Sequence, residues 1–215
     1  MKIFVITGAI QTGKTTWIGR MLERAAERGL AVSGVLAPAV FENGSKTGID
    51  ALLLPGGERF ELGRKSAAFA QLADEHNAQQ SAAASSSEHG AQQAAEHGAQ
   101  RGAAANTGEG AAAAQRVRLA WGMDESALER INAHFRVLRQ EGFGQLMVVD
   151  EFGPLEFSGN QGYTEGMAIM DAGLPANALL VLRPSLLDAA RERWGECELL
   201  GVESNIEEFL NKLEP

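Results

Sequence analysis

Apolar and polar positions along the chain fall into blocks that predict strands and helices in turn. Residues 2–7 form a short run rich in isoleucine, valine and phenylalanine that ends at Gly8, which is typical of a buried parallel strand. From Lys14 to Arg28 the apolar positions recur at helical spacing, and Gly29 stands where a helix commonly ends. A strand, a loop and a helix are therefore predicted to follow one another directly.

The next part of the chain carries turn signals that predict a small antiparallel excursion. Residues 31–39 are strand-like, and Asn43-Gly44 predicts a tight turn before the strand-like residues 47–54. A second turn, Pro55-Gly56-Gly57, leads to the strand-like residues 59–62. We expect hairpins here, at the edge of a parallel sheet, where antiparallel strands are common.

Helices and strands alternate in the second half of the chain. The predicted helices lie at 124–140, 162–170, 186–194 and 206–213, and the predicted strands at 146–149, 178–182 and 198–200. Such alternation is typical of a mostly parallel sheet with helices on both faces. The predicted fold class is therefore α/β, with a β-hairpin excursion after the second strand.

Residues 74–115 interrupt this alternation. They consist mainly of Ala, Gln, Ser, Gly, Glu and His, with no large apolar side chain among them. Such a segment cannot bury enough surface to offset the entropy lost on ordering, so we predict a flexible low-complexity insertion within a single domain that spans residues 1–215. His76, His89 and His97 are widely spaced in it and are interpreted as solvated residues rather than metal ligands.

The loop between the first strand and the first helix matches the phosphate-binding pattern Gly-x-x-x-x-Gly-Lys-Ser/Thr. Its glycines let backbone N–H groups point inward, and the helix N-terminus adds partial positive charge. Lys14 is expected to reach the β- and γ-phosphates as a catalytic residue, and Thr15 to hold Mg²⁺ through its hydroxyl. The residues expected to bind the nucleotide are Gly8, Ala9, Ile10, Gln11, Thr12, Gly13, Lys14, Thr15 and Thr16.

Two acids follow the apolar strand of residues 146–149, at the position where open parallel sheets bind their ligands. Asp150 is expected to hold Mg²⁺ opposite Thr15, directly or through water. Glu151 is placed to orient or deprotonate an attacking water, which makes it the second candidate catalytic residue. Glu156 has two open interpretations: it approaches the site from the Gly-Pro turn before it, or it is a solvated loop acid.

Three passages together resemble the THEP-type, or cancer-related, nucleoside-triphosphatase family. They are the loop at 8–16, the passage at 35–50 that contains Glu42-Asn43-Gly44-Ser45-Lys46-Thr47-Gly48-Ile49-Asp50, and the run Asp150-Glu151-Phe152-Gly153-Pro154-Leu155-Glu156. The last is similar to the family signature Asp-Glu-Ile-Gly-x-Met-Glu-Leu. The resemblance covers residues 1–65 and 116–205, whereas the insertion, and Gln11-Thr12 in place of a further glycine, depart from the family pattern.

This resemblance implies a RecA-like P-loop NTPase fold and slow, Mg²⁺-dependent hydrolysis of ATP, GTP and other nucleoside triphosphates. The positions that match the family's functional residues are Lys14, Thr15, Asp150 and Glu151. Arg183, after the strand at 178–182, is similar to a family arginine or lysine near the site.

The composition of the chain limits which binding partners and which cellular compartment we expect. The 215 residues carry a formal net charge of -9, which disfavours nucleic acid and anionic membranes as partners. Cys197 is the only cysteine in the sequence, so an internal disulfide is excluded and a reducing compartment fits best. No apolar stretch has the length of a membrane span or a signal-peptide core, so the expected location is the cytoplasm.

Two alternatives to hydrolysis stay open. A P-loop kinase of a nucleoside or small metabolite would need an acceptor pocket and an arginine-bearing lid, for which Arg116 and Arg118 are the nearest candidates. A nucleotide-dependent accessory protein would hydrolyse nucleotide only incidentally.

Two further motifs are weighed and set aside. Residues 157–161 resemble the transporter-ATPase signature but follow the acidic strand instead of preceding it, and we interpret them as a loop. A dedicated GTP switch is disfavoured, because the sequence contains no guanine-reading Asn-Lys-x-Asp motif.

Overall fold

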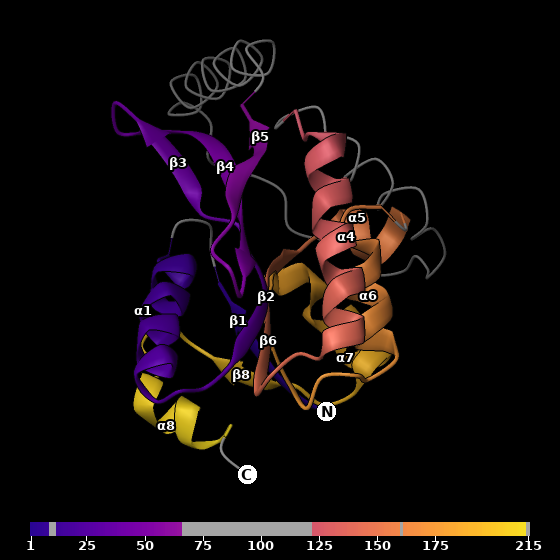
Figure 1. Cartoon of the computed structure of the whole chain (residues 1–215). Helices are drawn as coiled ribbons and strands as arrows, with labels where there is room; N and C mark the ends of the chain where they lie inside the picture. Colours follow the sequence, from indigo (N-terminus) through magenta and orange to yellow (C-terminus); the bar gives the residue numbers. More distant parts are fainter. Residues whose placement is uncertain (9–11, 66–121, 160, 214–215) are drawn as a thin grey trace, which may run out of the picture.

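One mostly parallel sheet organises the chain (Figure 1). The computed structural model describes residues 1–8, 12–65, 122–159 and 161–213. The strands in this part of the chain follow the order β3-β4-β2-β6-β7-β1-β8, and β5 pairs with β4. They are β1 Lys2–Thr7, β2 Val32–Leu36, β3 Ala39–Glu42, β4 Ser45–Leu54, β5 Arg59–Arg64, β6 Leu146–Phe152, β7 Asn177–Leu182 and β8 Glu198–Leu200.

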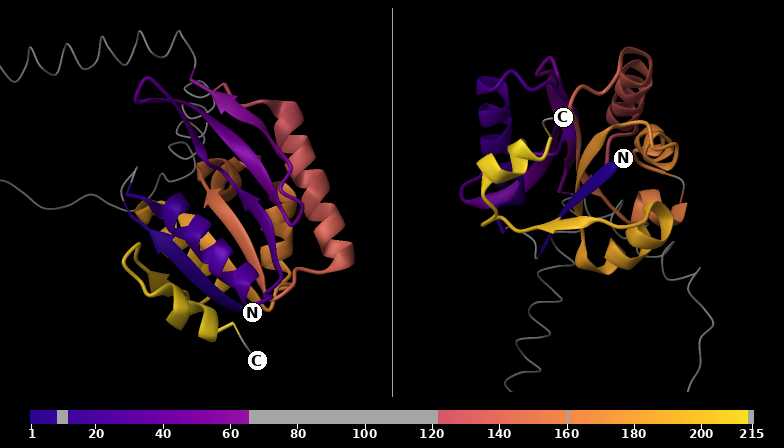
Figure 2. Two further views of the ribbon diagram at one scale, coloured as in Figure 1. Left: turned by 60° about the vertical axis from the view of Figure 1, so that its left-hand side comes forward. Right: turned by 90° about the horizontal axis from the view of Figure 1, so that it is seen from below.

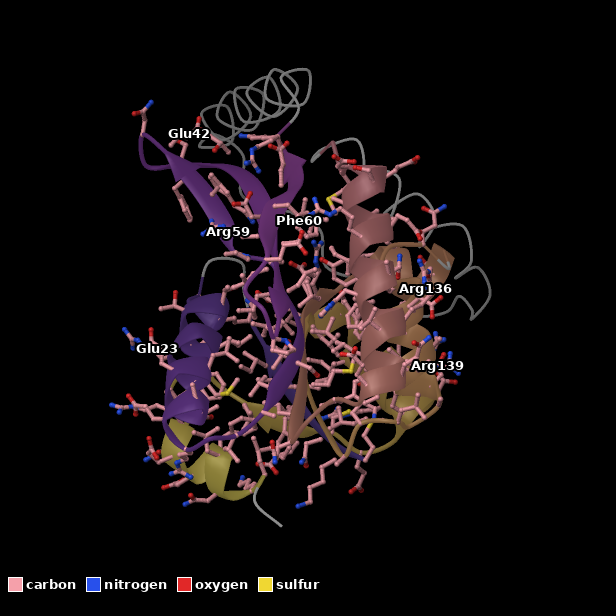
Figure 3. All side chains as sticks on the ribbon, in the orientation of Figure 1. Glu23, Glu42, Arg59, Phe60, Arg136 and Arg139 are labelled. Carbon is pink, nitrogen blue, oxygen red and sulfur yellow. The ribbon has the colours of Figure 1, made fainter. Side chains whose placement is uncertain are left out.

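Helices cover both faces of this sheet, as the alternation of elements predicts (Figure 1 and Figure 2). α1 and α8 pack on one face, whereas α4, α6 and α7 pack on the other. The exposed Arg136 and Arg139 of α4 point away from the sheet, as expected on the solvent side of an amphipathic helix (Figure 3). The helices are α1 Lys14–Glu27, α4 Glu125–Glu141, α5 Pro154–Gly159, α6 Thr164–Asp171, α7 Leu187–Trp194 and α8 Ile206–Asn211, with a 3₁₀ turn at Pro184–Leu186.

Alternate residues of the central strands supply two separate cores. In β1, Ile3 and Val5 pack under α4 and α6, whereas Phe4 and Ile6 pack under α1 and α8. The rings of Phe4 and Phe209 meet edge to face with their centroids 5.0 Å apart, which helps to hold α8 against the sheet. The apolar run at residues 2–7 therefore has the double burial expected of a central parallel strand.

The antiparallel excursion is present at the sheet edge, as predicted. β2 pairs in parallel with β6 on one side and antiparallel with β4 on the other. The β3–β4 turn has positive φ angles at Asn43 and Gly44, 50° and 79°, as the Asn-Gly signal predicts. A bulge interrupts this hairpin, because the register moves from Val40 opposite Gly48 to Phe41 opposite Lys46.

A second bulge lies in β6, and sequence patterning did not predict it. The register with β7 moves from Val149 opposite Leu180 to Phe152 opposite Leu182, so β6 carries one extra residue. Glu151 has a φ of 79°, unusual for a residue other than glycine. The bulge returns Phe152 to the core that contains Val149 and leaves Glu151 outside that core.

The prediction of a loop at residues 157–161 is wrong for residues 157–159, which belong to α5. The chain turns at Gly153 and enters this short helix at Pro154, a residue whose fixed φ suits a first helical position. The predicted insertion at 74–115, with its three histidines, lies outside the described residues, as do Arg116 and Arg118. Within the described ranges, no helix is both long and apolar enough for a membrane crossing.

Glu156 anchors the segment that follows β6, and its burial shows that the interpretation as a solvated loop acid is wrong. Its carboxylate accepts hydrogen bonds from the backbone N–H groups of Gly153 (2.8 Å) and Tyr163 (3.0 Å). The residue is only 9% exposed and does not line the cleft that contains Asp150. Burial raises the pKa of Glu156 to about 7, although the two backbone hydrogen bonds oppose this shift.

The raised pKa of Glu156 predicts that the stability difference between wild type and Glu156→Gln depends on pH. Because the folded pKa lies above the unfolded value, wild type loses stability as the pH rises from 4.5 to about 7. The free energy of unfolding of the variant minus that of wild type should therefore increase by roughly 3 kcal/mol as the pH rises through this window. Urea denaturation at pH values from 4.5 to 8 measures this shift.

The exposed Glu141, at the end of α4, provides the matched control. Glu141→Gln measures the pH dependence that replacement of an exposed glutamate introduces by itself. The raised pKa would be contradicted if the stability difference between Glu156→Gln and wild type changed with pH no more than that of Glu141→Gln. This holds even if Glu156→Gln is destabilised at every pH by the loss of one backbone hydrogen bond.

Candidate nucleotide-binding site

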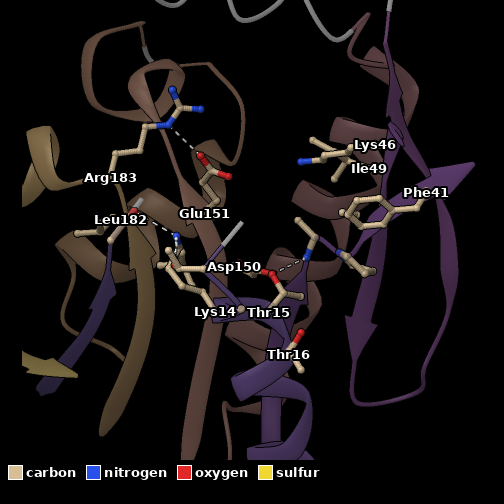
Figure 4. A pocket seen from close by; sticks show the side chains of 17 residues that line it. Lys14, Thr15, Thr16, Phe41, Lys46, Ile49, Asp150, Glu151, Leu182 and Arg183 are labelled. Atoms are coloured by element: carbon tan, nitrogen blue, oxygen red, sulfur yellow. Dashed lines mark hydrogen bonds and ion pairs between the residues drawn. The ribbon is translucent and has the colours of Figure 1, made fainter. Parts of the chain in front are cut away.

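A cleft of about 420 Å³ lies where parallel strands β1, β2, β6 and β7 end (Figure 4). In parallel sheets, this edge is where ligands bind. One wall consists of the loop before α1, the floor contains the acids of β6, and the β3–β4 hairpin forms the opposite wall. The lining residues are Gly8, Thr12–Thr16, Ala37, Pro38, Ala39, Phe41, Lys46, Ile49, Asp150, Glu151, Val181, Leu182 and Arg183.

The described part of the phosphate loop has the geometry that its glycine spacing predicts. Gly13 caps α1 with a φ of 89°, a left-handed conformation that glycine adopts without a steric cost. Lys14 Nζ donates to Gly8 O (3.2 Å) and Thr12 Oγ1 (3.3 Å), so its ammonium group lies against the loop. Thr16 also lines the cleft. Of the predicted nucleotide-binding residues, Ala9, Ile10 and Gln11 lie outside the described residues.

Thr15 and Asp150, which are 135 positions apart in the sequence, form a hydrogen bond. Thr15 Oγ1 donates to Asp150 Oδ2 over 3.0 Å, and the backbone N–H of Ala37 donates to the same oxygen over 3.2 Å. Asp150 is 3% exposed, and this burial raises the pKa of its carboxyl group, whereas the two hydrogen bonds oppose the shift. The structure thus brings together the two residues that the sequence analysis selected as Mg²⁺ ligands.

The donor set around Asp150 fits a magnesium ion. A hydroxyl and a carboxylate oxygen are the hard ligands that Mg²⁺ prefers, and the ion usually keeps several waters, for which the open cleft has room. A positive ion would also offset the desolvation that disfavours the charged form of Asp150.

Glu151 and Arg183 face each other across the ends of β6 and β7. Arg183 Nε donates to Glu151 Oε1 over 2.9 Å, and both side chains stay partly exposed in the cleft. The bulge in β6 points the Glu151 carboxylate toward this space, and bulges of this kind are frequent beside active sites. The expectation that Arg183 lies near the site therefore agrees with the structure.

The hairpin wall of the cleft was not predicted from the sequence. Phe41 and Lys46 both line the cleft, although they were cited only as part of a passage that resembles a family. Burial in the cleft lowers the pKa of Lys46, whereas the negative charges of Glu151 and Asp150 raise it. The signal available in the sequence was a basic residue two positions after a predicted tight turn, which by itself does not show what the side chain faces.

Three comparisons with known proteins bear on this site. A family model described as NTPase matches residues 3–84, which include the phosphate loop and the hairpin but not the acids of β6. No curated protein matches the chain. Two solved structures match it with a sequence identity of 18% each.

Both solved structures match this chain over its full length. A human cancer-related nucleoside triphosphatase has a TM-score of 0.56 and is matched over 98% of its own length. THEP1 from the hyperthermophile Aquifex aeolicus has a TM-score of 0.50 and is matched over 100% of its length. The chain therefore has a P-loop NTPase fold, its residues 3–84 match the NTPase family model, and these findings together confirm its resemblance to the THEP-type nucleoside-triphosphatase family.

Proposed function

We propose that this chain hydrolyses nucleoside triphosphates, including ATP and GTP, to diphosphate and phosphate in a Mg²⁺-dependent reaction in the cytoplasm. The observation that carries the proposal is the convergence in one cleft of Lys14 and Thr15 from the loop with Asp150 and Glu151 from β6. P-loop enzymes need these four groups to hold phosphates, metal and an attacking water. The general nucleoside-triphosphatase assignment supported by the comparisons agrees with this reaction.

Lys14 and the N-terminus of α1 would bind the phosphate chain. The ammonium of Lys14 now donates to neutral loop oxygens at 3.2 and 3.3 Å. Charged phosphate oxygens are stronger acceptors than these neutral oxygens, so a bound triphosphate would draw the ammonium away from the loop. The first turn of α1 contains no acidic residue of its own, so no side chain of this turn would offset the partial positive charge of the helix N-terminus that acts on the phosphates.

Thr15 and Asp150 would hold Mg²⁺, and the bound ion would neutralise charge on the β- and γ-phosphates. The hydrogen bond to the backbone of Ala37 orients the Asp150 carboxylate for this role, because it fixes Oδ2 on the side of Thr15.

Glu151 would orient the water that attacks the γ-phosphorus and would accept its proton. The bond from the γ-phosphorus to the bridging oxygen breaks as the water oxygen attacks, which releases the diphosphate and phosphate. Arg183 donates a hydrogen bond to the Glu151 carboxylate, and its positive charge would also attract the negatively charged terminal phosphoryl group of a nucleotide.

Replacement of Glu151 tests the proposed hydrolysis. Glu151→Gln keeps the size of the side chain but cannot accept a proton, so phosphate release should fall roughly 100-fold or more while ATP binding persists. The measurement is phosphate release from ATP, GTP, CTP and UTP with Mg²⁺. The control is Glu42→Gln. This exposed glutamate at the end of β3 does not line the cleft, so its replacement should leave the rate unchanged.

Two results would count against this assignment. If wild type releases no phosphate from any of the four nucleotides, the proposed hydrolysis is wrong. If Glu151→Gln releases phosphate at the wild-type rate, another group must orient the water.

Replacement of Asp150 tests the proposed metal site through binding. Asp150→Asn keeps an oxygen that can accept from Thr15 and Ala37 but loses the charge that attracts a cation. Wild type should bind ATP more tightly with Mg²⁺ than with EDTA. In the variant, the ratio of these two affinities should be smaller by about tenfold or more. Isothermal titration with and without Mg²⁺ gives both affinities. A variant that keeps the full Mg²⁺ effect would exclude Asp150 as a ligand.

A further inference from the structure

Lys46 is a basic side chain that the phosphate-loop mechanism leaves without a role. Of the described residues that line the cleft, three are basic, and they come from three different elements: Lys14 from α1, Lys46 from β4 and Arg183 from the end of β7. Lys46 extends from the hairpin wall toward the space in front of Asp150 and Glu151 (Figure 4). It therefore faces the loop and the acids from the opposite side.

The bulge in β4 determines this orientation. Ile49 lies opposite Ala39 in the hairpin, and both line the cleft. Regular alternation would place Thr47, two residues before Ile49, on the same face. The extra residue in β4 shifts this alternation by one, so Lys46 lies opposite Phe41 and shares the cleft with it.

The charges around Lys46 place it at the end of the cleft where hydrolysis would occur. The charges that act on its ammonium include those of Glu151, the proposed water-orienting residue, Asp150, the proposed metal ligand, and Arg183. The terminal phosphoryl group of a bound nucleotide would lie between these acids and Lys14 if the proposed function is correct. Lys46 borders the same space, on the side formed by the hairpin, where it is the one basic side chain lining the cleft among residues 1–8, 12–65, 122–159 and 161–213.

We propose that Lys46 binds the terminal phosphoryl group and so allows the cleft to distinguish a nucleoside triphosphate from a diphosphate. This inference rests on the proposed nucleotide site and goes beyond it, because it assigns a substrate-binding residue outside the phosphate loop and the β6 acids. The ammonium would donate to γ-phosphate oxygens and offset charge on them, a contact that a diphosphate cannot make. The β3–β4 hairpin is then part of the substrate site.

The test compares binding of two nucleotides to Lys46→Met, which keeps the length of the side chain but removes its charge. Adenylyl imidodiphosphate, an ATP analogue that resists hydrolysis, and ADP are each titrated in the presence of Mg²⁺. The variant should bind the analogue roughly 10- to 100-fold more weakly, the effect of one charge-assisted hydrogen bond, and should bind ADP within about threefold of wild type. Lys46→Arg, which keeps the charge, should retain most of the affinity for the analogue.

Lys65→Met serves as the matched control, because this exposed lysine follows β5 in the same excursion and does not line the cleft. It should leave both affinities unchanged. Thermal unfolding of each variant identifies any loss of folding, and Lys46→Arg keeps the test valid if Lys46→Met unfolds.

The outcomes separate this inference from the proposed function. If Lys46→Met weakens both nucleotides equally or neither, the inference is wrong, and Lys46 only balances the charge of the acids. If wild type binds the analogue and ADP but releases no phosphate from ATP, hydrolysis fails, and the selectivity of the Lys46 variants still decides the role of the lysine. If wild type binds both nucleotides with the same affinity, the inference is overturned as well.

Discussion

The buried carboxylate of Asp150 is the group on which the geometry of the candidate site depends. It accepts hydrogen bonds from Thr15 Oγ1 at the start of α1 and from the backbone of Ala37 at the end of β2. One side chain therefore joins the phosphate loop, the acidic strand and the entrance to the hairpin. Because burial disfavours its charged form, loss of either partner would leave a poorly satisfied buried carboxylate. The position of this carboxylate therefore depends on all three segments.

Two β-bulges arrange the charged side chains around this carboxylate. The bulge in β6 leaves Glu151 outside the core and beside Arg183, and the bulge in β4 turns Lys46 into the cleft from the opposite side. Each bulge leaves one strand residue without a regular partner on the neighbouring strand, and Glu151 also adopts a strained backbone conformation. The cores on either side of the sheet hold these local irregularities in place. Phe152, directly after Glu151, is fully buried and anchors the bulge.

Much of the fold was predictable because the strands of this sheet are short and strongly apolar. The run at residues 2–7 and the Asn43-Gly44 turn led to elements that the structure contains, since burial on both faces and a tight hairpin each require particular residue types. Residues 157–159 were not predictable as a helix, because a single turn has too few positions to show helical spacing. The role of Glu156 was missed for a different reason: its partners are backbone N–H groups, which no side-chain pattern reveals.

The sequence by itself determined which kinds of ligand the main residues of the site are suited to bind. Lys14 and Thr15 follow a glycine-rich loop, and Asp150 ends an apolar run, so phosphate and metal chemistry could be inferred from local residue types alone. Only the tertiary structure decided that Lys46 and Phe41 share the cleft with them. The direction of a side chain in a strand reverses with every residue, so one extra residue in a strand changes what a side chain faces. The position of such a bulge depends on pairing with a neighbouring strand, and this information is not local in the chain.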